Sequence, residues 1–309
     1  MFNLNFDDGS PIAYINGGEH DKEILYRNSN KDHKNKKKIN IDEIAILIEN
    51  LYRTMNGKMS FKTLEQLRDA IIEKKRPINR ELGRHYDHAL KILDQTKDKE
   101  VVLQEGELIP MFDESQERQV FMIAGMSGSG KSTFTASLCR TYKKQFPENK
   151  IILFSNKPSD PVFDRLSYIE RIVINEDLLQ DPITLNEMED ALVLFDDVEY
   201  SSNKDIDKEL DRIRDLILQQ GRSYHVSFVY ISHQCNNYKQ TRTILNECHS
   251  VTIFPAMTTR YSLKYLLEKY WGFDKAQINK LVKLPSRAVT IYKSPPLVLY
   301  KSGAYLVNE

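Results

Sequence analysis

Residues 125–132 have the types and spacing of a loop that binds nucleotide phosphates, because they fit the pattern G-x-x-x-x-G-K-[ST]. The glycines of such a loop let backbone N–H groups face phosphate oxygens, and a helix expected from Thr133 onward adds the positive end of its dipole. We expect Lys131 to contact the β- and γ-phosphates and Ser132 to bind Mg²⁺. The predicted binding residues for ATP and Mg²⁺ are therefore Gly125, Met126, Ser127, Gly128, Ser129, Gly130, Lys131, Ser132 and Thr133.

Two adjacent carboxylates, Asp196 and Asp197, follow an apolar run at residues 191–195. At the end of a buried strand the first acid can hold the Mg²⁺ shell, and we assign that role to Asp196. Asp197 then faces the nucleotide, where it can polarise a water for attack on the γ-phosphate. This arrangement favours hydrolysis over transfer to a hydroxyl. Two acids at a strand end also suit a loop start or a helix cap, and the upstream phosphate loop favours the catalytic interpretation.

Three polar residues, Ser232, His233 and Gln234, follow another apolar run at residues 226–231. Polar side chains at the end of a neighbouring central strand lie next to the γ-phosphate and can orient the attacking water. We therefore predict a sensor group here, with the member that touches the nucleotide left open. A histidine at a strand end is also common as a surface or capping residue.

Arg222 follows an amphipathic helix whose apolar face is formed by Ile206, Leu210, Ile213 and Ile217, and it comes directly after Gly221. Gly221 suits a helix C-cap, and a basic residue beside it favours the helix dipole. The alternative makes Arg222 an arginine finger that reaches the γ-phosphate of a neighbouring subunit, with Arg242 as the second choice. Both interpretations stay open at this point.

These candidate residues need a scaffold, and the chain after residue 101 alternates apolar strands with helices. Strands are predicted at residues 119–124, 150–154, 171–174, 191–195, 226–231 and 251–254. This alternation predicts an α/β fold with a mainly parallel sheet between helices. Further on, we expect a helix at 262–270, a helix capped by Asp274 with Gln277, and a hairpin from strands at 287–293 and 297–301.

The first hundred residues have a different character. Residues 1–27 suggest short strands with tight turns, residues 28–38 are rich in lysine, and three amphipathic helices are expected near 40–51, 63–76 and 82–93. The lysine-rich segment is either a solvated linker or a phosphate contact. We predict an accessory region at 1–100 and a P-loop ATPase domain at 101–309.

Composition restricts the setting in which the protein works. The 309 residues carry 44 Lys+Arg and 44 Asp+Glu, so nucleic-acid binding must come from local patches or from assembly. The three cysteines, Cys139, Cys235 and Cys248, lack metal-ligand spacing and point to reduced thiols in an intracellular compartment. No apolar run approaches the roughly 20 residues that cross a membrane.

Together, the phosphate loop, the acidic strand and the two later motifs resemble the FtsK/HerA superfamily of DNA-pumping ATPases, most closely the virion DNA-packaging ATPases of large DNA viruses. In FtsK-like proteins a Gly-Arg turn precedes an apolar strand that ends in Thr-Gln, and here Gly221-Arg222 and Ser232-His233 take those places. His233 replaces the usual Gln, and Asp197 stands where many members carry Glu. Residues 241–255 and 262–270 also look like stretches from viral ATPases of this type.

The resemblance covers roughly residues 118–300 and implies a RecA-like core, a hexameric ring, double-stranded DNA as the cargo and capsid or other viral proteins as partners. It implies a place in the virion or in a viral factory of the host cytoplasm. Two other function classes stay open. One is a regulatory ATPase switch that binds a protein through residues 1–100. The other is a small-molecule kinase, which predicts an arginine-rich lid and no acid at position 197.

Overall fold

The computed structural model describes residues 2–4, 10–27, scattered positions between 66 and 87, 100–198, 203–235, 241–294 and 296–307. The chain divides into two units, one formed by residues 1–2 and 28–101 and the other by residues 3–27 and 102–309. In the first unit, the helical residues 66–67 and 69–71 fall within a predicted helix, and Leu67 and Ile71 are buried. The predicted helix at 40–51 and the lysine-rich segment lie outside the described residues.

A mixed sheet forms the centre of the second unit. Its parallel strands are β6 (Val120–Ala124), β7 (Lys150–Ser155), β8 (Ile169–Val173), β9 (Ala191–Asp196), β10 (Ser227–Ser232) and β11 (Ser250–Ile253). An antiparallel extension adds β12 (Val289–Tyr292), β13 (Leu297–Tyr300) and β14 (Gly303–Leu306). All strands predicted between residues 119 and 254 are present, and the predicted C-terminal hairpin is confirmed.

The strand order within this unit is β14-β13-β12-β11-β6-β10-β9-β7-β8. Strand β10 therefore lies between β6, which enters the phosphate loop, and β9, which ends in Asp196. This arrangement matches a RecA-like P-loop NTPase, and the predicted fold class is confirmed. Because the strands are parallel, the residues that follow β6, β9 and β10 meet at one edge of the sheet.

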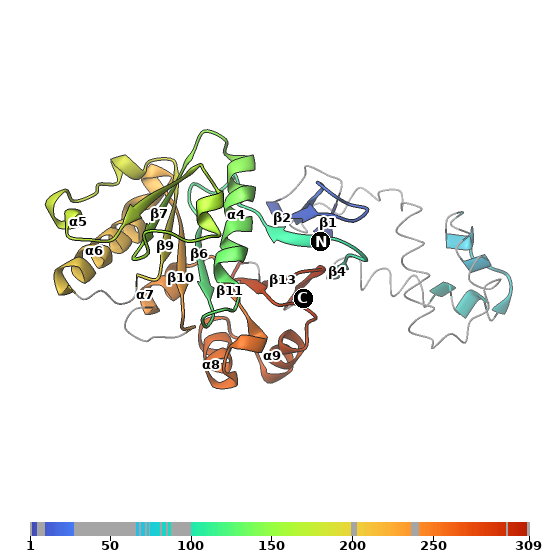
Figure 1. Ribbon diagram of the computed structural model, residues 1–309. Helices are drawn as coiled ribbons and strands as arrows, with labels where there is room; N and C mark the ends of the chain where they lie inside the picture. Colours follow the sequence, from blue (N-terminus) through green and yellow to red (C-terminus); the bar gives the residue numbers. More distant parts are fainter. Residues whose placement is uncertain are drawn as a thin grey trace. The chain divides into compact units, whose positions relative to one another are not determined.

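Helices cover both faces of the sheet (Figure 1). They are α4 (Lys131–Gln145), α5 (Asp177–Gln180), α6 (Lys204–Gln220), α7 (Arg242–Glu247), α8 (Arg260–Tyr270) and α9 (Lys275–Val282). Short 3₁₀ turns lie at Phe163–Arg165, Asn186–Met188, Gly221–Tyr224 and Pro255–Met257. The predicted capping box of α9 is present, since Asp274 accepts from the Gln277 backbone at 2.8 Å and Gln277 accepts from the Asp274 backbone at 2.7 Å.

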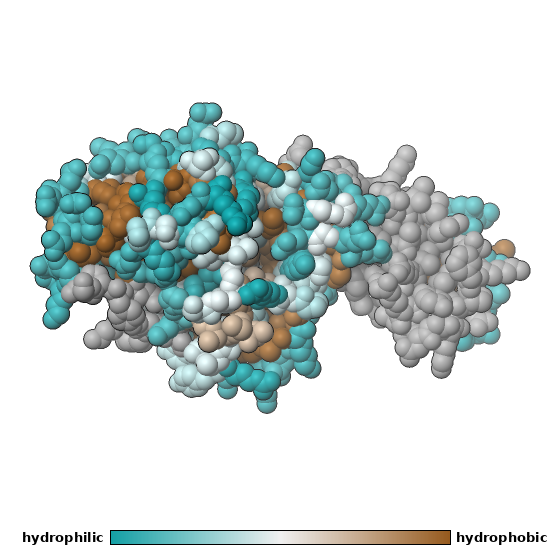
Figure 2. Space-filling view, viewed as in Figure 1, coloured by the Kyte–Doolittle hydropathy of each residue, from teal (hydrophilic) through white to brown (hydrophobic). Residues whose placement is uncertain are grey.

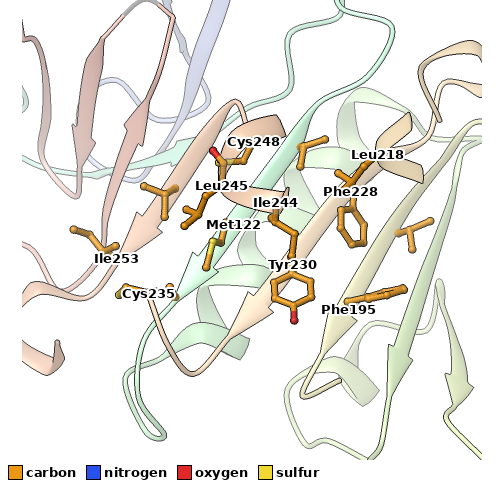
Figure 3. Packing of buried hydrophobic residues seen from close by; sticks show 14 of the residues in the cluster. Met122, Phe195, Leu218, Phe228, Tyr230, Cys235, Ile244, Leu245, Cys248 and Ile253 are labelled. Carbon is orange, nitrogen blue, oxygen red and sulfur yellow. The ribbon is translucent and has the colours of Figure 1, made fainter. Parts of the chain in front are cut away.

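The core consists of two apolar layers, one on each face of the sheet. Successive residues of a strand point to opposite faces, so Met122 joins one layer while Phe121 and Ile123 join the other. The layer with Met122 packs against α6, α7, α8 and α9, and Phe195, Phe228 and Tyr230 lie within it (Figure 3). The other layer packs against α4. Both layers hold the ends of β6, β9 and β10 in fixed register.

A smaller sheet in the second unit has the order β3-β2-β5, with β2 at Ser10–Asn16, β3 at Ile24–Arg27 and β5 at Glu107–Pro110. The short strands β1 (Phe2–Asn3) and β4 (Glu100–Val102) lie where the chain passes between units. Residues 1–27 were expected in the accessory region, whereas the structure groups residues 3–27 with the phosphate loop. The reason is long-range pairing of β2 with β5, which a local pattern does not reveal.

The surface carries mostly hydrophilic side chains on one face, and the three cysteines lie in the interior. The face seen in Figure 2 is mostly hydrophilic, with smaller apolar areas between charged and polar side chains. Among the described residues, no helix combines the length and the apolar character that a membrane crossing needs. Cys139, Cys235 and Cys248 are free and buried, and burial raises the pKa of Cys139 to about 12.

Candidate nucleotide site

The phosphate loop connects β6 to α4 and has the backbone shape that its sequence predicts. Gly130, which precedes the first residue of α4, has φ of 105°, a left-handed value that favours glycine. A Cβ atom on Gly125 would lie 2.7 Å from Ser129 Oγ and 2.8 Å from the Phe254 ring, so only glycine fits there. The loop thus leads directly into the amino terminus of a 15-residue helix. The backbone N–H groups of this first turn have no partner within the helix and attract anions.

Lys131 folds back over this loop. Its side chain donates to the carbonyl oxygen of Gly125 at 2.7 Å and to that of Met126 at 3.4 Å. The residue is only 7% exposed, so its charge lies inside the loop and not in bulk water. The ammonium group is therefore placed where phosphate oxygens can replace carbonyl oxygens as its acceptors.

His233 connects Lys131 to the acidic strand. Its Nδ1 lies 3.4 Å from Lys131 Nζ, and its Nε2 lies 2.5 Å from Asp197 Oδ1. The pairing of β10 with both neighbours explains this position, because Ser232 lies opposite Ala124 and Ile231 lies opposite Asp196. The structure therefore brings together three of the residues that the sequence singled out.

Asp197 adopts φ of 56°, which turns its carboxylate away from the line of β9. One oxygen contacts His233, the other accepts from Lys157 Nζ, and the backbone carbonyl accepts from Asn156 Nδ2 at 2.7 Å. Burial acts to raise the pKa of Asp197, but the hydrogen bonds from Lys157 and His233 outweigh it and leave the pKa below its usual value. Asp197 is thus ionised at neutral pH, with both oxygens engaged.

The sequence did not indicate Asn156 and Lys157. They follow β7, which pairs with β9 in parallel, and this places them at the edge of the sheet that carries Asp197. The hydrogen bond to Asp197 is also the main reason why the pKa of Lys157 is raised. In the sequence, only their position after a predicted strand pointed to these two residues. To place them beside Asp197 one also needs the order of the strands in the sheet.

Asp196, at the end of β9, is 3% exposed. Burial and the neighbouring charge of Asp197 raise its pKa to about 6. The Asp196 carboxylate and the Ser132 hydroxyl are oxygen donors of the kind that suits Mg²⁺. The described residues contain no group of three or more metal-binding side chains. Ser132 and Asp196 fit Mg²⁺ by the chemistry of their oxygens, because this ion usually takes phosphate oxygens and water as its remaining ligands.

The three members of the predicted sensor group take different positions. Ser232 is fully buried, and its Oγ donates to the Gln234 carbonyl at 2.8 Å and accepts from the Gln234 N–H at 3.0 Å. This turn projects His233 toward Lys131. The His233 side chain contacts both Lys131 and Asp197.

Arg222 lies in the turn before β10, at the opposite end of that strand from His233. A six-residue strand spans roughly 20 Å, so Arg222 does not reach the phosphate loop of its own chain. The arginine is exposed and pairs with Glu117. The last carbonyls of α6 accept from Arg118, whose Nη1 lies 2.8 Å from Ile217 O and 2.7 Å from Leu218 O.

Gly221 occupies the C-cap position of α6 as predicted, but with a helical φ of −57°. The left-handed residue of this turn is His225, with φ of 53°. A Cβ atom on Gly221 would lie 3.4 Å from Ile217 and from Val226, so the small size of glycine serves close packing here and not a left-handed turn.

A further arginine contacts the phosphate loop from a distant part of the chain. Arg287 Nε donates to Ser129 O at 2.7 Å, and its Nη2 donates to Gly128 O at 2.7 Å. Arg287 lies 158 residues from Ser129 in the sequence, and no local motif marks it.

Comparison with known proteins gives a relative from a virus. The chain is 39% identical over 208 residues to protein V3 of Sputnik virophage, a match that spans 66% of this chain and 83% of the relative. The chain belongs to the protein V3 family. A family model described as RNA helicase also matches residues 121–212, from the phosphate loop region into α6.

Solved structures similar to this V3-family protein include viral and bacterial ATPases. The DNA-packaging ATPase B204 of Sulfolobus turreted icosahedral virus has 12% identity and a TM-score of 0.44, over 60% of this chain and 98% of B204. The pCW3 conjugation coupling protein TcpA has 12% identity and a TM-score of 0.44, over 69% and 68% of the two chains. The cytoplasmic domain of the type VII secretion ATPase EccC of Thermomonospora curvata has 15% identity and a TM-score of 0.45, over 70% and 29%.

Proposed function

We propose that this protein is an ATP-hydrolysing motor that moves double-stranded DNA and loads a viral genome into a capsid, working as a ring of subunits. The observation that carries the proposal is the contact chain from Lys131 through His233 to Asp197, since it joins the phosphate-binding group to an ionised carboxylate across three neighbouring strands. The resemblance of these motifs to DNA-pumping ATPases supports DNA as the cargo, and the virophage relative supports a viral setting.

Hydrolysis needs a water that is oriented toward the γ-phosphate and a group that takes its proton. Asp197 is ionised and lies one residue beyond the acid assigned to Mg²⁺, so it is the proton acceptor. In the structure its oxygens accept from Lys157 and His233, and each oxygen keeps a further lone pair with which Asp197 can accept from the water. Bound phosphate competes with the carbonyl oxygens for Lys131, which rearranges the same chain of contacts. Mg²⁺, held by Ser132 and Asp196, supplies charge neutralisation of the phosphates when bound.

The position of Arg222 supports the proposed ring. An exposed arginine at the far edge of the sheet can act on a γ-phosphate only if that phosphate belongs to another subunit. A ring also explains how a chain without net positive charge could bind DNA. A few basic side chains from each subunit would line a shared channel, and their phosphate contacts would add up. No element of the sequence is of a kind that reads bases, which suits a motor that must move over any sequence.

The test measures ATP hydrolysis with and without duplex DNA, together with oligomer mass with and without nucleotide. We expect stimulation by duplex DNA and a larger assembly with ATP. Lys131→Ala should lower hydrolysis at least about a hundredfold, because the phosphate loses its point-charge partner. An unchanged rate with DNA from a protein that stays monomeric would rule out the motor. Phosphate found on an acceptor molecule would indicate a kinase instead.

The match to an RNA helicase model makes strand separation the second candidate. A triplex displacement assay separates the two activities. A translocase displaces a third strand from an intact duplex, whereas a helicase releases one strand of the duplex itself. Release of labelled strands from a duplex or an RNA hybrid, without displacement of a third strand, would favour the helicase.

A further inference from the structure

Arg287 contacts the phosphate loop through the carbonyl oxygens of the loop. The residue lies between α9 and β12, and its guanidinium group makes two hydrogen bonds of 2.7 Å to consecutive loop carbonyls, those of Gly128 and Ser129. Gly130 makes room for it, because a Cβ atom on Gly130 would lie 3.3 Å from Arg287 Nε. The two hydrogen bonds and the space left by Gly130 thus fix the position of the guanidinium group beside the loop.

The planarity of the peptide unit gives this contact a consequence for the phosphate side of the loop. A trans peptide points its C=O and N–H in opposite directions. The hydrogen bond from Arg287 to the Ser129 carbonyl therefore directs the Gly130 N–H away from the arginine. The preceding peptide is fixed as well, since Gly128 O accepts from Arg287 while the Ser129 N–H donates to Met126 O at 3.1 Å.

The segment that carries Arg287 is held by hydrogen bonds of its own. Ser286 Oγ donates to the Ala288 carbonyl at 2.6 Å and accepts from the Lys301 N–H at 3.0 Å, which ties this segment to the hairpin. Strand β12, which follows, is buried and pairs with β11 of the central sheet. The antiparallel extension therefore places a fixed positive charge beside the phosphate loop.

We propose that Arg287 is a positioning residue of the nucleotide site: from the carbonyl side it holds the phosphate loop in its phosphate-binding shape. The inference rests on the proposed nucleotide binding and adds the C-terminal sheet extension as a support of the loop. Because Arg287 acts through the loop, it strengthens the binding of ATP and ADP alike and leaves the chemical step nearly unchanged. This separates it from an arginine that touches the γ-phosphate, which acts on turnover and on ATP only.

The experiment compares full-length Arg287→Ala and Arg287→Lys with the wild type, using titration with fluorescent ADP and ATP analogues and steady-state hydrolysis. We expect Arg287→Ala to raise Kd for both nucleotides about tenfold, in keeping with loss of two charge-assisted hydrogen bonds at a half-exposed site, and to leave kcat within about twofold. Arg287→Lys keeps the positive charge but loses the planar, two-pronged arrangement of N–H donors. Its Kd values should therefore lie between those of the wild type and those of Arg287→Ala.

Lys283→Ala is the matched control, because it removes one positive charge from an exposed position of the same segment. Its Kd values should equal those of the wild type. Unchanged Kd in Arg287→Ala would overturn the proposal, and so would a large loss of kcat with unchanged Kd for ADP. If Lys283→Ala weakened nucleotide binding as much as Arg287→Ala does, the effect would come from the loss of any nearby positive charge. That result would also overturn the proposal. Failure of the wild type to bind either nucleotide would instead overturn the nucleotide site, and this role with it.

Discussion

His233 Nε2 lies 2.5 Å from Asp197 Oδ1, and the other nitrogen of the same ring faces Lys131 Nζ at 3.4 Å. Lys131 can only donate, and ionised Asp197 can only accept. A neutral ring with its proton on Nε2 therefore matches both neighbours. The imidazole links the phosphate-binding lysine to the carboxylate that is proposed to take the proton.

The first prediction concerns this link. His233→Ala should lower kcat for ATP about a hundredfold with a smaller effect on KM, because the carboxylate loses one of the groups that orient it. His233→Gln should retain more activity, since an amide can accept from Lys131 and donate to Asp197 at once. Steady-state hydrolysis measures both variants.

His225 offers a matched control at the opposite end of β10, where it pairs with Asp190 at 3.2 Å. His225→Asn is suitable, because asparagine tolerates the left-handed backbone at this position. The control should hydrolyse ATP at the wild-type rate. Equal activity of His233→Ala and wild type would remove His233 from the site.

Much of this site could be predicted from the sequence, for a physical reason. Strands β6, β9 and β10 are continuous apolar runs because both faces of a parallel sheet are covered, and each run ends at residues of the proposed site. Sequence alone could not say which of Ser232, His233 and Gln234 faces the lysine. That choice is made by the turn in which Ser232 bonds to the Gln234 backbone.

The missed residues depend on contacts between distant parts of the chain. Lys157 and Asp197 are 40 positions apart, and Arg287 and Ser129 are 158 apart. Each pair exists only because a particular strand order brings two loops to one edge of the sheet. The same reason explains the N-terminal strands, whose partner β5 lies beyond the accessory region.

The second prediction uses the buried carboxylate of Asp196. Its pKa rises from 3.8 to about 6 in the folded chain, mainly by desolvation. The folded state therefore binds more protons than the unfolded state between these values, and stability falls as pH rises through this window. The shift is a cost on the order of 2–3 kcal/mol to the nucleotide-free protein above pH 6.

Asp196→Asn replaces the charge with a neutral group of the same shape. We expect the nucleotide-free variant to melt a few degrees higher than the wild type at pH 7.5, and the difference to shrink toward pH 4. Hydrolysis that depends on Mg²⁺ should be lost in the same variant. Thermal melts across pH measure the first effect, and a lower Tm at pH 7.5 would contradict the assigned cost.

The third prediction concerns Lys157. Because its hydrogen bond is the main influence that lowers the pKa of Asp197 against burial, Lys157→Met should raise the pKa of that carboxylate. The proposed base works only when ionised, so the acid limb of the kcat profile should move to higher pH. Profiles at saturating Mg²⁺ and ATP isolate this effect from the titration of Asp196.

Lys150→Met is the control for this variant, because Lys150 begins β7 at the opposite edge of the sheet. Its acid limb should coincide with that of the wild type. An unmoved limb in Lys157→Met, with kcat retained, would show that Asp197 is not the base whose titration limits the rate.

The fourth prediction tests whether Arg222 acts between subunits. Arg222→Ala and Lys131→Ala should each be inactive alone if the arginine completes the site of a neighbour. Mixed rings contain interfaces at which an intact phosphate loop meets an intact arginine, so a mixture of the two variants should recover part of the wild-type hydrolysis. Recovery should follow the mixing ratio and be greatest near equal amounts.

The ion pair between Arg222 and Glu117 supplies the control. Glu117→Gln breaks the pair and leaves the arginine in place. An exposed pair contributes at most about 1 kcal/mol to stability, so this variant should fold normally and, if the arginine acts on a neighbour, hydrolyse ATP at or above the wild-type rate. Full activity of Arg222→Ala alone would exclude a finger. Loss of activity in both Arg222→Ala and Glu117→Gln, without recovery on mixing, would show that the pair only holds the turn before β10.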